Sequence, residues 1–148
     1  MICIDSDVFL IDLRYPTDRR ASETRAFLDR IAASGKGTTT VFNLLEIAGV
    51  LSFNLNPQQL LELYIHFPAR YHVRVLPSGD LRAPLPGVRT AEVFQVIQRK
   101  AALGDALIAA LVNRLQQEIT AFVTWNEHHF RGRITVPIFT PSTFPTRH

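Results

Sequence analysis

Three acidic residues stand in surroundings that are otherwise apolar. Asp5 comes directly after the apolar run Ile2-Cys3-Ile4, and Glu46 interrupts the almost continuous apolar stretch 43–53. Asp105 opens a segment rich in alanine. Burying a lone carboxylate costs several kcal/mol or raises its pKa. Each of these acids therefore needs a partner, which can be an arginine, a set of backbone N–H groups or a metal ion.

Each acid also has a purely structural explanation. Asp5 and the neighbouring Asp7 could cap the helix that follows them, and Asp105 could cap its own helix, where the helix dipole favours a negative charge. Glu46 could pair with a buried arginine. The residues taken singly do not decide between these explanations and a metal ion.

Other polar residues are predicted at the same edge of a sheet. Asn43 and Glu46 lie three residues apart, so they share one face of a helix that directly follows a strand. Thr124 and Asn126 stand at the carboxyl end of a later strand. Because parallel strands bring their carboxyl ends to one edge, where ligands bind, we expect these side chains to approach Asp5.

Carboxylate and amide oxygens are ligands that favour Mg²⁺ or Mn²⁺. One or two such ions would activate a water and neutralise phosphate charge. The adjacent His128 and His129 are expected on the surface, and no His or Cys spacing is typical of zinc. The sequence has no Gly-rich phosphate loop and no Gly-x-Ser-x-Gly elbow, and Cys3 lies too deep in a strand to act as a nucleophile.

The apolar periodicity predicts helices and strands that alternate along the chain. The expected strands are 2–4, 38–42, 71–75, 120–125 and 134–139, the last at an edge because of Pro137. The expected helices are 7–13, 22–33, 43–53, 57–67, 90–103 and 105–118. A loop is expected at 77–87. This order predicts an α/β fold: a three-layer α/β/α sandwich with a central, mostly parallel sheet of four to five strands.

The composition is that of an ordinary globular chain. The 148 residues include 47% hydrophobic and 20% charged residues, with a formal net charge of +3. Cys3 is the only cysteine, so an intramolecular disulfide is excluded and a reducing compartment is expected. We see no signal peptide and no apolar run that could cross a membrane, so the expected location is the cytoplasm.

The positive charge is carried almost entirely by arginine, because only Lys36 and Lys100 among sixteen basic residues are lysine. Arginine suits phosphate or a carboxylate-bearing partner, although the chain has no dense basic tract. The candidate contacts to RNA or a protein partner are Arg14, Arg19, Arg20, Arg131 and Arg133.

Four blocks of the sequence, in order, resemble the PIN-domain nucleases. They are Ile2-Cys3-Ile4-Asp5-Ser6-Asp7, Asn43-Leu44-Leu45-Glu46, Gly104-Asp105-Ala106-Leu107-Ile108-Ala109-Ala110 and Thr124-Trp125-Asn126-Glu127-His128-His129-Phe130. The chain as a whole is most similar to the VapC-like toxins of toxin–antitoxin pairs. The resemblance implies one PIN-like domain over 1–148, and a homodimeric Mg²⁺- or Mn²⁺-dependent ribonuclease that acts on RNA and is silenced by a cognate antitoxin protein.

The resemblance also implies a role for each site residue. The acidic triad would be Asp5, Glu46 and Asp105, and the metal would be held by Asp5, Asp105 and Asn126. Ser6, Asp7, Asn43 and Thr124 would be auxiliary, with Ser6 orienting the first acid. Asn126 stands where the family often has a fourth aspartate, and its amide offers a neutral oxygen, which weakens the case for a second metal.

Two other functions fit parts of the sequence. Asn126 favours a catalytically weakened PIN-like domain that only binds RNA or protein. The sequence Asp5-Ser6-Asp7 also resembles the Asp-x-Asp motif of haloacid-dehalogenase-like phosphatases, for which Lys100 could supply the lysine, but no second acid follows Asp105. The apolar faces of 9–13 and 27–31 could form core or a groove for an antitoxin helix. The RNA target is not readable from the sequence.

Overall fold

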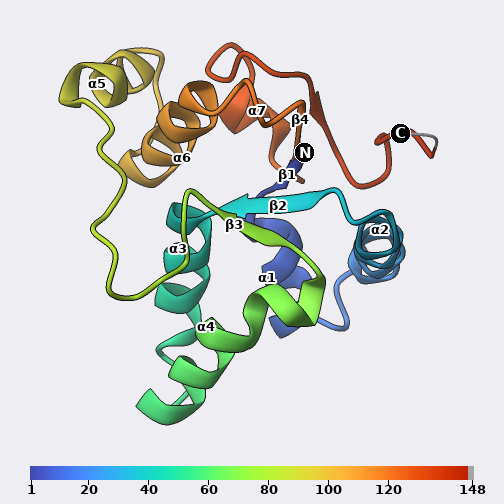
Figure 1. The fold of residues 1–148 in the computed structure, drawn as a ribbon. Helices are drawn as coiled ribbons and strands as arrows, with labels where there is room; N and C mark the ends of the chain where they lie inside the picture. The colour runs from blue at the N-terminus through green and yellow to red at the C-terminus, as the bar shows by residue number, and fades with distance from the viewer. Residues whose placement is uncertain (147–148) are drawn as a thin grey trace.

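Five short strands form one parallel sheet at the centre of the computed structural model, which describes residues 1–146 (Figure 1). The last two residues of the expected domain, 147–148, lie outside this part. The sheet order is β3-β2-β1-β4-β5, and every neighbouring pair is parallel. The strands are β1 (Ile2–Ile4), β2 (Gly37–Thr40), β3 (Arg74–Leu76), β4 (Ala121–Val123) and β5 (Ile138–Phe139).

Helices cover both faces of the sheet, as the predicted α/β/α sandwich requires (Figure 1). The first group is α1 (Ser6–Arg14), α2 (Ala21–Ser34), α3 (Val41–Leu51) and α4 (Pro57–Tyr71). The second group is α5 (Thr90–Gln98), α6 (Leu103–Arg114) and the short α7 (Glu127–Phe130). No helix within residues 1–146 has both the length and the apolar character needed to cross a membrane.

Successive side chains of β1 point to opposite faces of the sheet and so pack into two separate layers of the core. Ile2 and Ile4 pack with buried residues of α1 to α4, whereas Cys3, between them, packs with α5, α6 and α7. The apolar faces of 9–13 and 27–31 belong to the first layer, where Phe9 and Phe27 are fully buried. These two faces therefore form core rather than an open groove.

The strand register brings several polar residues to the carboxyl edge. Cys3 lies opposite Thr38 on one side of β1, and Ile4 lies opposite Val123 on the other. The residues that follow are therefore neighbours, and the backbone N–H of Asp5 donates to Val123 O at 2.9 Å. Asp5 thus stands between the ends of β2 and β4, as expected from the sequence.

Capping explains why two predicted boundaries are wrong. The strand expected at 38–42 ends at Thr40, because Thr40 and Asn43 form a reciprocal capping box that starts α3 at Val41. The helix expected to stop before Pro68 continues to Tyr71 with the proline inside it. Its end is set by His72 in the left-handed region (φ 52°), where the N–H of His72 donates to Pro68 O.

The remaining differences lie at the ends of predicted elements. The helix expected at 90–103 ends at Gln98, and the next begins at Leu103, so Gly104 lies inside α6 instead of breaking a helix. That helix ends at Arg114, short of the expected 118. The strands expected at 71–75, 120–125 and 134–139 are the shorter β3, β4 and β5, and α7 was not predicted. The loop at 77–87 has no helix or strand, as expected.

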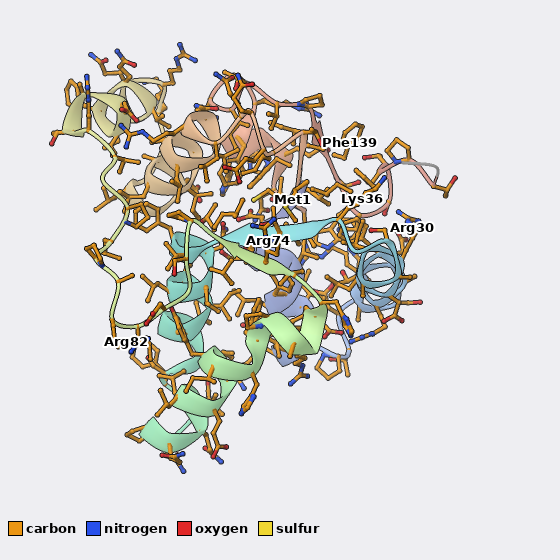
Figure 2. The ribbon with its side chains drawn as sticks, in the orientation of Figure 1. Met1, Arg30, Lys36, Arg74, Arg82 and Phe139 are labelled. Atoms are coloured by element: carbon orange, nitrogen blue, oxygen red, sulfur yellow. The ribbon has the colours of Figure 1, made fainter. Side chains whose placement is uncertain are left out.

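The opposite edge of the sheet is basic. Met1, Lys36 and Arg74 line one hollow at the amino ends of β1, β2 and β3 (Figure 2). Arg74 Nη1 lies 3.6 Å from the sulfur of Met1. Asp5, which directly follows β1, lies at the other edge, where parallel strands offer a ligand site.

Candidate functional site

Asp5 is buried at the carboxyl edge and held by three hydrogen-bond donors. Its side chain caps α1, with Oδ1 accepting from the backbone N–H of Ser6 at 2.8 Å. The same oxygen accepts from Asn43 Nδ2 at 2.9 Å, and Oδ2 accepts from Thr124 Oγ1 at 2.8 Å. Asp5 is therefore both a cap, as the structural explanation held, and the centre of a network that joins β1, α3 and β4.

The pKa of Asp5 is raised well above its ordinary value. Burial is the main cause, and the nearby charges of Asp7 and Glu46 add to it. The hydrogen bonds from Thr124 and Ser6 act in the opposite direction but do not cancel these effects. The surroundings of Asp5 therefore favour its neutral form over its ionised form.

Asp7 lies beside Asp5 and has one orphaned oxygen. Its Oδ2 accepts from the backbone N–H of Trp125 at 2.9 Å and from Thr124 Oγ1 at 3.2 Å. Its Oδ1 is buried and has no hydrogen-bond partner among residues 1–146. Burial raises the pKa of Asp7 to about 6, although the hydrogen bonds from Thr124 and Trp125 lower it. Buried polar atoms are almost always partnered, so this oxygen is available to contact a cation or a water.

Asn43 fixes the first acid from the start of α3. It is fully buried, and its Oδ1 accepts from Thr40 Oγ1 at 2.7 Å, which leaves the amide N–H groups to point at Asp5 and Ser6. The Ser6 hydroxyl accepts from Asn43 Nδ2 at 2.9 Å. The amide orientation is thus set by the cap, and it presents donors rather than an acceptor to Asp5.

Glu46 lies one turn further along α3 and is half-buried. Its pKa is raised, first by burial and then by the charge of Asp105, while a hydrogen bond from Ser6 lowers it. No ion pair between Glu46 and an arginine occurs within the described residues. A Cβ built on Gly104 would lie 3.3 Å from Glu46 Oε2, so the first turn of α6 passes directly by this carboxylate.

Asp105 is the third residue of α6 and not its cap, because the cap position belongs to Ala102. Its Oδ2 lies 3.2 Å from Nδ1 of His129 in α7, and 27% of the Asp105 side chain is exposed. The sequence predicts that both histidines lie on the surface. Both are exposed, but His129 also contacts the third acid, which was missed because α7 was not predicted.

Asn126 stands at the turn between β4 and α7. Its backbone N–H donates to Thr124 Oγ1 at 3.0 Å, and its carbonyl accepts from the N–H of His129 at 3.0 Å. Its side chain is half-buried and does not cap α7. The amide oxygen is therefore available for a ligand at the same edge as Thr124.

The arginines named as candidate contacts fall into two groups. Arg133 is used inside the structure, because its guanidinium donates to backbone carbonyls of 99, 100, 128, 129 and 131. Arg20 is half-buried, pairs with Asp18 and lies 5.8 Å over the ring of Trp125. The exposed ones are Arg14, Arg19 and Arg131.

The donor set fits a hard divalent cation. Asp5, Asp7, Glu46 and Asp105 form a row of carboxylates that raise the pKa values of their neighbours, and the donors are almost all oxygen. Within residues 1–146, no three His, Cys, Asp or Glu side chains lie close enough to enclose an ion as they stand. The fit therefore rests on the clustered charge and on the orphaned oxygen of Asp7.

The chain has the fold of two solved structures. One is FitAB bound to the IR36 DNA fragment, in which a chain matches with a TM-score of 0.65 and 20% identity over 100% of both chains. The other is FitAcB from Neisseria gonorrhoeae, with a TM-score of 0.63 and 20% identity over 96% of this chain and 99% of that one. No model of a known protein family and no curated protein matches. The expected PIN-like α/β fold is thus confirmed.

Proposed function

We propose that this chain is a single PIN-like domain over 1–148 that hydrolyses RNA with the help of a bound Mg²⁺ or Mn²⁺. The observation that carries the proposal is the row of carboxylates at the carboxyl edge, with Asp5 fixed by three donors and Asp7 left with an unpartnered buried oxygen. Helix capping accounts for the donors around Asp5, but it does not account for the buried, unpartnered oxygen of Asp7 or for several acids gathered at one edge, because isolated carboxylates avoid such burial.

Asp5, Asp105 and Asn126 would hold the ion. When bound, a divalent cation lowers the pKa of a coordinated water and neutralises charge on a phosphate. Glu46 has a raised pKa, which suits a group that accepts a proton from water near neutral pH. Asn43 and Thr124 keep the two Asp5 oxygens in place, and Ser6 does the same for Glu46.

The partners follow from the resemblance to FitAB. One of the two similar structures is FitAB bound to a DNA fragment. This similarity supports the proposal that the present chain also acts together with a second protein. We propose that this chain is the toxin and that the second protein is its cognate antitoxin. Large exposed apolar side chains are consistent with surfaces that a second subunit or an antitoxin covers. They are Phe53, Ile65, Leu81, Leu85, Phe94 and Leu103.

Asn126 supports a second candidate, a PIN-like domain that binds RNA or protein without cleaving it. The amide of Asn126 is neutral, whereas the PIN-domain family often has an aspartate at this position. The site therefore has one negative charge fewer, which lowers its affinity for a cation. The test is RNA cleavage by the purified chain with Mg²⁺ or Mn²⁺, with EDTA, and as the variant Asp105→Asn.

We expect cleavage by the wild-type chain to disappear with EDTA and with Asp105→Asn. The matched control is Asp80→Asn, which removes an exposed acid that pairs with Arg82 in the 77–87 loop. This control should cleave like the wild type. Cleavage that survives EDTA contradicts the metal requirement, and a wild-type chain that binds RNA but never cuts it favours the second candidate.

Gly104→Ala tests the close approach of α6 to Glu46. The added Cβ at 3.3 Å from Oε2 forces the carboxylate to move by a few tenths of an ångström. Alanine is also favoured over glycine in a helix by roughly 1 kcal/mol. We expect an unchanged or higher melting temperature together with about tenfold slower cleavage, since misplaced catalytic groups lose rate steeply.

Gly49→Ala is the control for this variant. Gly49 lies in α3, and a Cβ there meets nothing within 4 Å. It should bring a similar gain in stability without any loss of cleavage. Equal cleavage by the two variants would show that the position of Glu46 does not matter for the reaction.

A further inference from the structure

His129 is the one imidazole that lies within hydrogen-bond distance of these acids in the described structure, and its ring nitrogen, unlike an amide nitrogen, can coordinate a metal ion. Its Nδ1 lies 3.2 Å from Asp105 Oδ2, and its side chain is 45% exposed. Two ligands that occupy neighbouring positions around an octahedral ion, each about 2.1 Å from the metal, lie roughly 3.0 Å apart. The separation of these two atoms is therefore suited to a shared ion as well as to a hydrogen bond.

The backbone that carries His129 is firmly held. Its N–H donates to Asn126 O, so the histidine is tied to the residue proposed as another metal ligand. Arg133 Nη1 donates to the carbonyls of His128 at 2.9 Å and His129 at 3.1 Å, while its Nε donates to Arg99 O at 2.8 Å. This single guanidinium joins α7 to the end of α5.

Packing fixes α7 from its other side. Phe130 is fully buried and packs against Phe122 of β4, with the ring centres 4.8 Å apart. The ring of His128 packs edge-on against that of His129 with centres 4.3 Å apart. An imidazole placed beside a carboxylate on such a support is pre-organised for binding, which a freely moving surface histidine is not.

We infer that His129 is a nitrogen ligand of the metal ion next to Asp105, and that this ligand makes the site prefer Mn²⁺ to Mg²⁺. The inference rests on the proposed function, because it takes the metal site of Asp5 and Asp105 as its premise. Mg²⁺ is bound through oxygen and water, whereas imidazole suits the later first-row metals, and Mn²⁺ accepts both kinds of donor.

The experiment is a Mn²⁺ titration of the full, metal-free chain followed by electron paramagnetic resonance. The loss of the signal of free Mn²⁺ gives the affinity, and electron spin-echo modulation detects a directly bound ¹⁴N. We expect ¹⁴N modulation in the wild type and in His128→Ala, but not in His129→Ala or His129→Asn. We also expect Mn²⁺ affinity to fall about 10- to 100-fold in the His129 variants, while Mg²⁺ affinity stays unchanged.

The outcomes separate this inference from the proposed function. Mn²⁺ that binds the wild type without ¹⁴N modulation, or modulation that is lost in His128→Ala instead, overturns the role of His129 and leaves the oxygen-based metal site standing. A wild-type chain that binds no Mn²⁺ overturns the metal site itself and the inference with it. His129→Asn keeps a side-chain donor for Asp105, so a mere hydrogen-bonding role would leave its Mn²⁺ affinity near that of the wild type.

Discussion

Asp5→Asn is expected to abolish RNA cleavage while leaving the fold intact. The substitution removes the negative charge at the centre of the site and keeps nearly the same shape. We expect the cleavage rate to fall by roughly 10³-fold, the order seen when one group that stabilises transition-state charge is removed. The measurement is single-turnover RNA cleavage beside a thermal melt of each protein without added metal.

The hydrogen bonds around Asp5 explain why the fold should tolerate the amide. The new carbonyl oxygen can accept from the Ser6 N–H and from Asn43 Nδ2, as Oδ1 does now. The new N–H₂ group would face Thr124 Oγ1, whose hydroxyl can turn to donate to Asp7 Oδ2 at 3.2 Å. The substitution also removes the repulsion between Asp5 and Asp7.

We therefore expect the melting temperature of Asp5→Asn at pH 7 to equal or exceed that of the wild type. Asp5→Ala should behave differently, because it leaves the N–H of Ser6 and one of the two N–H groups of the Asn43 amide without an acceptor, at about 1–3 kcal/mol for each buried group. Asp29→Asn, at an exposed residue of α2, serves as the charge control and should keep full cleavage. Full cleavage by Asp5→Asn would remove Asp5 from the reaction.

Residues at strand ends could be predicted from the sequence because a parallel sheet allows few arrangements. A short apolar run followed by Asp5, and another followed by Thr124, must bring both to the same edge once the strands are adjacent and parallel. Glu46 followed from the same logic, since a helix that begins at the end of β2 starts at that edge. The order and direction of the strands are therefore enough to predict that these residues meet at one edge, and no side-chain contact has to be known in advance.

Residues whose position depends on local capping could not be predicted in the same way. Asn43 appeared in the sequence as a polar neighbour of Glu46, but its contact with Asp5 depends on the capping box with Thr40, which also ends β2 early. The contact of His129 depends on a four-residue helix that has no periodicity to detect. A signal was available for the first, because Thr40-x-x-Asn43 has the spacing of a capping box.

The structure also changes how Asp7 is understood. The sequence assigns it a supporting part, and its Oδ2 does fix the backbone of Trp125. Its Oδ1, however, is buried and accepts no hydrogen bond in the described part of the chain, so no protein donor competes with a ligand for it. Asp5, in contrast, has donors on both oxygens. The orphaned oxygen therefore makes Asp7 a stronger candidate for metal contact than its sequence position suggests.

Stability of the metal-free chain is expected to fall as the pH rises from about 4 to 7. The folded pKa of Asp7 is about 6, against an ordinary value of 3.8, so the folded state binds more protons than the unfolded state between these values. Stability then decreases with rising pH, by on the order of a few kcal/mol. The pKa values of Asp5 and Glu46 are also raised and act in the same direction.

A bound cation should reverse this trend, because it replaces the missing positive charge just where the acids ionise. At a concentration of about 100 times its dissociation constant, a ligand adds about 2.7 kcal/mol to the free energy of unfolding, which is about 5–10 °C in melting temperature for a chain of this size.

The measurement is a series of thermal melts from pH 4 to 8, with EDTA or with MnCl₂. The melting temperatures in the two conditions should diverge above pH 6 and converge below pH 4. Asp5→Asn should make the EDTA curve less steep, because only the contribution of Asp7 and Glu46 remains, and it should reduce the response to Mn²⁺, whereas Asp29→Asn should change neither. A melting temperature that increases with pH in EDTA would mean that groups within the protein already neutralise the acids. In that event the charge of these acids would no longer be a reason to expect a cation at this edge.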